Sequence, residues 1–193
     1  MAINIAIFAS GSGTNAEQLI KHFNQVADIS VNAVFCNKPD AFVIQRAKKL
    51  NVLPFVFNKQ EFSDPAFVSK LKSLNTDFIV LAGFLWKIPE FLIQQYSDKI
   101  INIHPALLPA YGGKGMYGAK VHQAVIDNKE TNSGISIHLV NENYDEGRIL
   151  FQASCEIDPK DTADSLANKI HQLEHQYFPP IVEDYIHEYA LKN

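Results

Sequence analysis

The sequence is poor in the features that mark membrane, disulfide-rich and metal-binding proteins. Its 193 residues contain two cysteines, and no apolar run reaches the roughly 18 residues that a membrane span needs. Cys36 and Cys155 lie far apart and form no CxxC motif, so we expect buried, reduced thiols and not a metal pair. The N-terminus lacks a basic stretch followed by a long apolar segment, so we expect a cytoplasmic protein without a signal peptide.

Positive charge is also scarce. The chain has 17 lysine and arginine residues against 21 aspartate and glutamate residues, a net charge of −4. Proteins that bind nucleic acid through phosphate contacts usually show the opposite balance, so we expect neither nucleic acid nor a membrane as a partner. A small anion can still bind, because the first free N–H groups of a helix attract negative charge whatever the net charge is.

The first hundred residues alternate between strand-like and helix-like patterns. This alternation predicts a mostly parallel sheet with helices on both faces. Strands are expected at Ile3–Phe8, Ser30–Cys36, Val52–Phe57, Asp77–Ala82 and Ile100–Ile103, the third weakened by Pro54. Helices are expected at Asn15–Val26, Ala41–Leu50, Phe67–Leu74 and from near Pro89.

The remaining residues have a different pattern. A loop rich in glycine and proline at Pro105–Gly118 precedes a helix at Ala119–Asp127. Two strands, Gly134–Val140 and Arg148–Ile157, are close enough to form an antiparallel pair. A long terminal helix from Asp161 is expected to be interrupted at Pro179-Pro180. We therefore predict one α/β, Rossmann-like domain over residues 1–193.

The first candidate site is the segment Ser10–Asn15, which follows the first strand and opens the first helix. Glycines allow a sharp turn and a close approach of the backbone to a ligand, and phosphate is the usual ligand of such a turn. The segment lacks the Gly-Lys-Ser/Thr of a Walker loop, and Asn37-Lys38 replace the acidic residue of a dinucleotide site. Taken alone, it indicates either a phosphate site or a glycine-rich helix start without a ligand.

Two further segments carry polar side chains. Asn102 and His104 end a buried strand and face the same side, where an amide and an imidazole suit oxyanion stabilisation or proton transfer. They equally fit a capped strand end. The acids of the loop Asn141–Gly147 fit a solvated turn. His138 before this loop fits a core histidine, and His171 with His175 lacks the glutamate of a zinc-binding HExxH motif.

Together these segments resemble the phosphoribosylglycinamide formyltransferases, a family of folate-dependent enzymes of purine biosynthesis. The similarity rests on Phe8–Asn15, Leu81–Phe84, Asn102–Pro109 and His138–Gly147, and it runs from the first strand to the terminal helix. It implies transfer of a formyl group from 10-formyltetrahydrofolate, as co-substrate, to the amine of 5'-phosphoribosylglycinamide. It implies no metal, and it leaves open a monomer or a homodimer.

The resemblance also implies roles for individual residues. Asn102, His104 and Asp145 match the catalytic residues, and Gly13, Thr14 and Asn15 match the loop that binds the substrate phosphate. Glu174 matches a position near the substrate ribose. Folate binding is implied for Leu85, Trp86, Lys87, Ile88, Asn102 and Asn141, with the rest of loop 141–145. The phosphate-binding half would be about residues 1–100, and the catalytic and folate-binding half about residues 100–193.

The sequence departs from many relatives at two places. Trp86-Lys87 replaces a Met-Arg pair, and Lys114–Gly118 replaces a histidine-containing loop. The expected chemistry needs Asn102 and a protonated His104 to stabilise an oxyanion, with Asp145 favouring the imidazolium.

Other functions require features that this sequence does not show. A formyltransferase acting on transfer RNA would have basic surface and a further domain, and a formylfolate hydrolase would have an additional N-terminal domain. A sugar-nucleotide formyltransferase would continue beyond the terminal helix. A nucleotide-sensing module without catalysis has no need for Asn102, His104 and Asp145 together, and an assay of folate-dependent product formation separates it from an enzyme.

Overall fold

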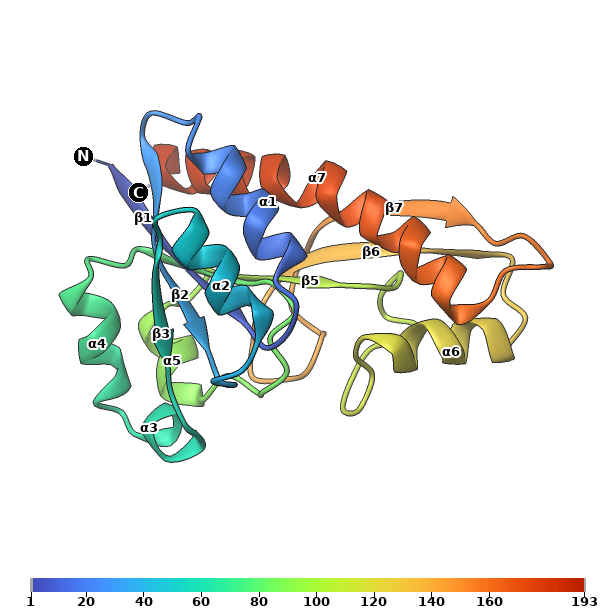
Figure 1. The fold of residues 1–193 in the computed structure, drawn as a ribbon, viewed down its shortest axis with the longest axis horizontal. Helices are drawn as coiled ribbons and strands as arrows, with labels where there is room; N and C mark the ends of the chain where they lie inside the picture. The colour runs from blue at the N-terminus through green and yellow to red at the C-terminus, as the bar shows by residue number, and fades with distance from the viewer. Residues whose placement is uncertain (1, 193) are drawn as a thin grey trace. The chain divides into compact units, whose positions relative to one another are not determined.

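A computed structural model describes residues 2–192, in which helices and strands alternate along the chain (Figure 1). It divides into two compact units, one ending at Ile101 and the other beginning at Asn102. The first unit contains β1 (Ile3–Ala9), α1 (Thr14–Phe23), β2 (Ile29–Cys36), α2 (Phe42–Lys49), β3 (Leu53–Val56), α3 (Lys59–Ser63), α4 (Phe67–Ser73), β4 (Phe78–Leu81) and α5 (Glu90–Gln95). Strand β5 (Ile100–His104) spans the boundary, and α6 (Ala119–Asp127), β6 (Asn132–Leu139), β7 (Ile149–Glu156) and α7 (Ala163–Lys192) follow.

The strand pairing confirms the predicted fold class. The seven strands follow the order β3-β2-β1-β4-β5-β6-β7 in one sheet. Strand β1 is parallel to both β2 and β4, and β2 is parallel to β3. Strands β6 and β7 are antiparallel, as their close spacing in the sequence predicted. The protein therefore has an α/β fold with a mixed sheet, and the glycine-rich turn follows β1 in the parallel part of that sheet.

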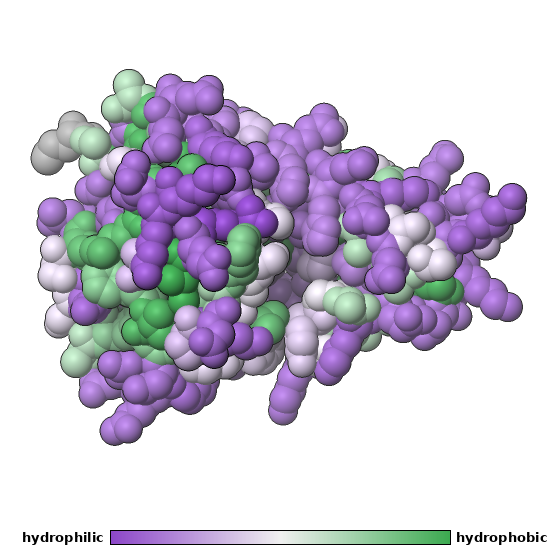
Figure 2. Space-filling model, viewed as in Figure 1, coloured by the Kyte–Doolittle hydropathy of each residue, from purple (hydrophilic) through white to green (hydrophobic). Residues whose placement is uncertain are grey.

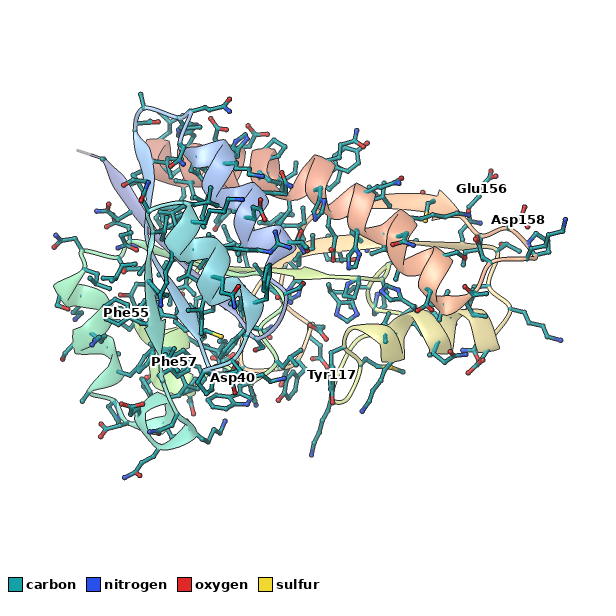
Figure 3. The ribbon with its side chains drawn as sticks, viewed as in Figure 1. Asp40, Phe55, Phe57, Tyr117, Glu156 and Asp158 are labelled. Atoms are coloured by element: carbon teal, nitrogen blue, oxygen red, sulfur yellow. The ribbon has the colours of Figure 1, made fainter. Side chains whose placement is uncertain are left out.

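The core of the first unit is aromatic. Phe8 at the end of β1 stacks on Phe35 of β2 with 5.0 Å between ring centroids, and Phe57, Phe62 and Phe67 pack around them. Figure 3 labels Phe57 beside β3, close to the short helix α3. Such edge-to-face and offset contacts add to the free energy of burial and fix the relative position of the strands.

Strand β3 is the edge strand at one end of the strand order. Its Pro54 cannot donate a ladder hydrogen bond, which an edge strand tolerates. Leu53 and Val56 are exposed there, as is Phe42 at the start of α2. Figure 2 shows apolar side chains gathered over this part of the first unit.

The second unit places polar groups inside its core. Ser136 of β6 is fully buried, and its hydroxyl donates to the carbonyl of Ala106 at 2.7 Å and accepts from the N–H of Leu108 at 2.9 Å. These bonds tie the loop after β5 to strand β6. Helix α7 contacts α6, β6 and β7, and so covers this strand pair on one side (Figure 1).

Two helices differ from the sequence predictions. Helix α7 runs unbroken from Ala163 to Lys192, so the predicted interruption at Pro179-Pro180 is wrong. Each proline removes one intrahelical hydrogen bond, but Phe178, Pro179 and Val182 are buried, so packing stabilises the helix at these positions. Helix α3 was not predicted, although its start carries a capping box between Asn58 and Glu61 that the sequence contains.

Candidate active site

Two side chains predicted to be catalytic come from the end of β5. Asn102 and His104 alternate with Ile103 along the strand, and the imidazole of His104 is 4 % exposed. Its Nε2 lies 2.8 Å from the carbonyl oxygen of Tyr111 in the following loop. Because a carbonyl only accepts, Nε2 carries the proton in the neutral ring and Nδ1 keeps a lone pair.

The third predicted residue, Asp145, comes to the same place from the loop between β6 and β7. Its Oδ2 is 3.6 Å from Nδ1 of His104 and accepts a hydrogen bond of 2.9 Å from the N–H of Gly113. Asp145 has a φ of 57°, a left-handed conformation that aspartate and asparagine adopt more readily than most residues. The structure therefore brings Asn102, His104 and Asp145 together within the second unit.

The loop that carries Asp145 is closed by a glycine at its far end. A Cβ on Gly147 would lie 1.7 Å from the carbonyl oxygen of Leu139, so no other residue fits without moving the backbone. Next to it, the N–H of Leu139 donates to the carbonyl of Arg148 at 2.9 Å. The two ends of the loop are thus joined directly, which sets the path of the residues between them.

A fourth side chain, His138, belongs to this group, although the sequence left it as a core histidine. Its Nδ1 lies 2.8 Å from the carbonyl oxygen of Leu139, and its Nε2 is 3.0 Å from Nδ2 of Asn102. A neutral ring with its proton on Nδ1 therefore accepts one N–H of the Asn102 amide. The same Nε2 is 3.6 Å from Oδ1 of Asp145. The signal in the sequence was the position of His138 on the strand that leads into the loop of Asp145.

Burial and neighbouring groups together determine the protonation of His104 and Asp145. Desolvation lowers the pKa of His104 below its ordinary value of 6.5, although the charge of Asp145 and the carbonyl of Tyr111 raise it. Burial raises the pKa of Asp145, but its interactions with His138, His104 and the N–H of Gly113 outweigh this and leave it lowered. The free protein at neutral pH therefore pairs a carboxylate with a neutral His104, so the imidazolium expected at the oxyanion has to form during the reaction.

The predicted phosphate loop lies in the first unit. Gly13 is the N-cap residue of α1 with a φ of 78°, and a Cβ there would lie 2.4 Å from Cγ2 of Val43. Only glycine fits this turn without strain or displacement. Thr14 and Asn15 form the first turn of the helix, whose N–H groups are the donors that an anion requires.

The segment predicted to bind folate is joined to this loop through Ser10. The N–H of Ser10 donates to the carbonyl of Gly83 at 3.1 Å, and its hydroxyl accepts from the N–H of Leu85 at 3.0 Å. Leu85 and Lys87 are exposed and Ile88 is buried. Trp86 packs against Phe57 and Phe62, with Nζ of Lys59 4.8 Å from its ring centroid.

The remaining candidate residues lie in the second unit. Glu174 of α7 is 6 % exposed, and Asn141 accepts a hydrogen bond of 3.0 Å from the N–H of Asn143 through its side chain. The segment Lys114–Gly118, which differs from the loop of many relatives, is on the surface, where Tyr117 is 42 % exposed (Figure 3).

Both cysteines are free, but Cys155 is only half-buried, so the prediction of two buried thiols holds for Cys36 alone.

Within residues 2–192, no group of three or more histidine, cysteine, aspartate or glutamate side chains is arranged to hold a metal ion. His171 and His175 stack with 6.4 Å between ring centroids. In the same residues, no helix has the length and apolar character to cross a bilayer.

Comparison with known proteins places these features in a family. Residues 3–182 match the family model described as formyl transferase. The phosphoribosylglycinamide formyltransferase of Bacillus subtilis is 35% identical over 184 residues, covering 92% of either chain. The chloroplastic enzyme of Arabidopsis thaliana is 40% identical over 92% of this chain, which spans 63% of that protein.

Solved structures agree with this assignment. The phosphoribosylglycinamide formyltransferase of Bacillus halodurans superimposes with a TM-score of 0.85 at 32% identity, covering 94% of both chains. The enzyme of Streptococcus pneumoniae gives a TM-score of 0.84 at 31% identity, covering 96% of this chain and 99% of its own. The chain is an enzyme of the formyl transferase family and groups there with the phosphoribosylglycinamide formyltransferases.

Proposed function

We propose that the protein transfers a formyl group from 10-formyltetrahydrofolate to the amine of 5'-phosphoribosylglycinamide, giving the N-formyl product and tetrahydrofolate in purine biosynthesis. The observation that carries this proposal is the meeting of Asn102, His104 and Asp145 in one group. The relatives that match almost the whole chain bear the name of this activity. We assign phosphate binding to the half at about residues 1–100, and catalysis with folate binding to the half at about residues 100–193.

The chemistry requires a stabilised oxyanion and a mobile proton. The amine attacks the formyl carbon, and the carbonyl oxygen becomes negatively charged in the tetrahedral intermediate. The amide of Asn102 has two N–H groups, one of which His138 accepts, and the second is the proposed donor to this oxygen. The hydrogen bond from this donor becomes stronger as the oxygen becomes negatively charged, so it stabilises the transition state more than the bound substrate.

His104 is the proposed carrier of the proton. A neutral imidazole can take up the proton that the amine loses as its new C–N bond forms. Asp145 then stabilises the imidazolium through opposite charge. The same proton passes to the folate nitrogen as the old C–N bond breaks, so the enzyme ends the cycle unchanged and no covalent intermediate is required.

Binding of the two substrates is assigned to the remaining candidate residues. Gly13, Thr14 and Asn15 supply backbone donors for the substrate phosphate, and Glu174 is assigned to the ribose. Leu85, Trp86, Lys87, Ile88 and Asn141 are assigned, with Asn102, to the folate. The phosphate is remote from the reacting amine, so its binding contributes by orienting the substrate.

An assay with both substrates tests the proposal. We expect purified protein to convert 10-formyltetrahydrofolate and 5'-phosphoribosylglycinamide into equal amounts of tetrahydrofolate and formylated product, without added ATP or metal. A chelator should leave the rate unchanged, and activity lost in chelator but restored by zinc would contradict this. Release of tetrahydrofolate without a formylated amine would indicate a hydrolase, and absence of turnover would indicate a binding module.

A further inference from the structure

Residues of helix α2 donate hydrogen bonds to the backbone of the glycine-rich turn after β1. The N–H of Val43 donates to the carbonyl of Gly11 at 3.2 Å, and Nε of Arg46 donates to the carbonyl of Ser12 at 3.0 Å. The next carbonyl, that of Gly13, accepts the first hydrogen bond of α1 from Glu17 at 2.9 Å. Three successive carbonyl groups therefore have defined partners.

Fixing these carbonyls also fixes the N–H groups of the turn. In a trans peptide the C=O and N–H of one plane point in opposite directions. The carbonyl of Gly11 shares its plane with the N–H of Ser12, and the carbonyl of Ser12 shares its plane with the N–H of Gly13. Because α2 holds both oxygens, both N–H groups point away from α2. Successive N–H groups arranged in this way form an anion-binding concavity.

The guanidinium of Arg46 makes a second contact that fixes its own position. Its Nη1 pairs with the carboxylate of Glu17 in the first turns of α1, while Nε remains on Ser12. The guanidinium carbon also lies 4.9 Å from the ring centroid of Phe42. A planar fork of donors spans two acceptors in this way, whereas the point charge of a lysine cannot reach both with the same geometry.

We propose that Arg46 is a positioning residue for the phosphate-binding turn, holding the peptide planes of residues 11–13 so that their N–H groups face the substrate phosphate. This rests on the proposed phosphate site at Gly13–Asn15. Arg46 acts through the backbone of Ser12 and need not touch the phosphate. If Arg46 is a positioning residue, phosphate affinity should depend on the hydrogen-bonding geometry of its guanidinium more than on its positive charge.

Three variants separate geometry from charge. Arg46→Lys keeps the charge, and Arg46→Gln removes it. Lys21→Met is the matched control, because Lys21 pairs with the same Glu17 at 2.6 Å from an exposed position on α1, where its side chain is 50 % exposed. For each variant we would measure KM for both substrates, kcat, the melting temperature and the dissociation constant of inorganic phosphate.

The expected result is a selective loss of phosphate affinity. Losing a hydrogen bond from a charged donor typically costs about tenfold or more, so Arg46→Lys and Arg46→Gln should each raise KM for the ribonucleotide and the phosphate dissociation constant about tenfold. KM for the folate and kcat should change less than about twofold, and Lys21→Met should match the wild type. In amide NMR spectra, phosphate should shift the Ser12 and Gly13 signals of the wild type more than those of either Arg46 variant.

Other outcomes would overturn the proposal. Full phosphate affinity in Arg46→Lys with a loss in Arg46→Gln would show that the charge acts alone. An equal loss of both substrates would indicate general damage to the fold. If the wild type bound phosphate but transferred no formyl group, the proposed function would fail while the phosphate titrations still decided the role of Arg46. If the wild type bound no phosphate at this turn, the positioning role would be wrong.

Discussion

The two units of the molecule bring different kinds of chemistry to the proposed reaction. The first unit offers backbone groups at Gly13–Asn15 and has a core of phenylalanine rings. The second unit buries titratable side chains, namely His104, His122, His138 and Glu174. Within the described residues, the buried polar side chains of the first unit are Ser10, Asn37 and Thr76, none of which ionises near neutral pH. In the first unit, activity should therefore respond most to substitutions that change the shape of a side chain. In the second unit it should respond most to substitutions that change charge.

The largest expected effect is at Asp145. Asp145→Asn keeps the size of the side chain and suits the left-handed backbone, but it removes the charge that stabilises a protonated His104. Losing an oxyanion-stabilising group typically costs about 10²–10³ in rate, so we expect kcat to fall by at least about 10² with both KM values little changed. Single-turnover experiments measure this.

The pH profile sharpens the same prediction. Because burial lowers the pKa of His104, the acid limb of kcat should have its midpoint below 6.5. Asp145 raises that pKa, so Asp145→Asn should move the midpoint to still lower pH. A midpoint that stays where it was, or moves upward, would separate Asp145 from the titration of His104.

The next effect concerns stability in acid. Burial, together with His171 and His104, lowers the pKa of His122 to about 4. The unfolded chain binds this proton near 6.5, so the free energy of unfolding falls as pH decreases from 6.5 to about 4, by up to about 3 kcal/mol. His122→Leu should flatten this part of the profile in urea titrations, and His22→Leu on α1 serves as the control. An equal acid slope in the wild type and His122→Leu would contradict the assignment.

A substitution in the first unit tests the sensitivity to shape. Gly13→Ala places a Cβ against Val43 in a turn with a positive φ, and a strained residue of this kind costs about 1–3 kcal/mol. We expect the ribonucleotide KM to rise by between about fivefold and about 150-fold, while the folate KM changes little. Equal losses for both substrates in isothermal titrations would indicate a damaged fold.

The smallest expected effect is at Glu142, an exposed acid of the loop that carries Asp145. Glu142→Gln should leave kcat within about twofold of the wild type, because exposed charges contribute little. Measured beside Asp145→Asn, it decides whether the loop acts through one carboxylate or through its overall charge. If the two variants behave alike, the proposed catalytic group is wrong.

Much of the fold followed from local sequence patterns, because alternating apolar segments specify strands and helices without knowledge of distant contacts. The helix Ala119–Asp127 was predicted with its observed bounds. The continuous α7 was not, since local rules for Pro179 and Pro180 do not include the packing that holds the helix. The role of His138 was missed for a similar reason: its partners, Asn102 and Asp145, lie far away in the sequence or across a loop.

The contacts of Ser10 have a consequence for how mutational effects combine. Its N–H bonds to Gly83 and its hydroxyl to the N–H of Leu85, so one residue joins the glycine-rich turn to the segment assigned to folate. Free-energy changes add only when two positions share no partner. The free-energy changes of a substitution in the turn and a substitution in segment 85–88 should therefore not add up to that of the double variant. When the Ser10 hydroxyl is removed, the same two substitutions should become closer to additive.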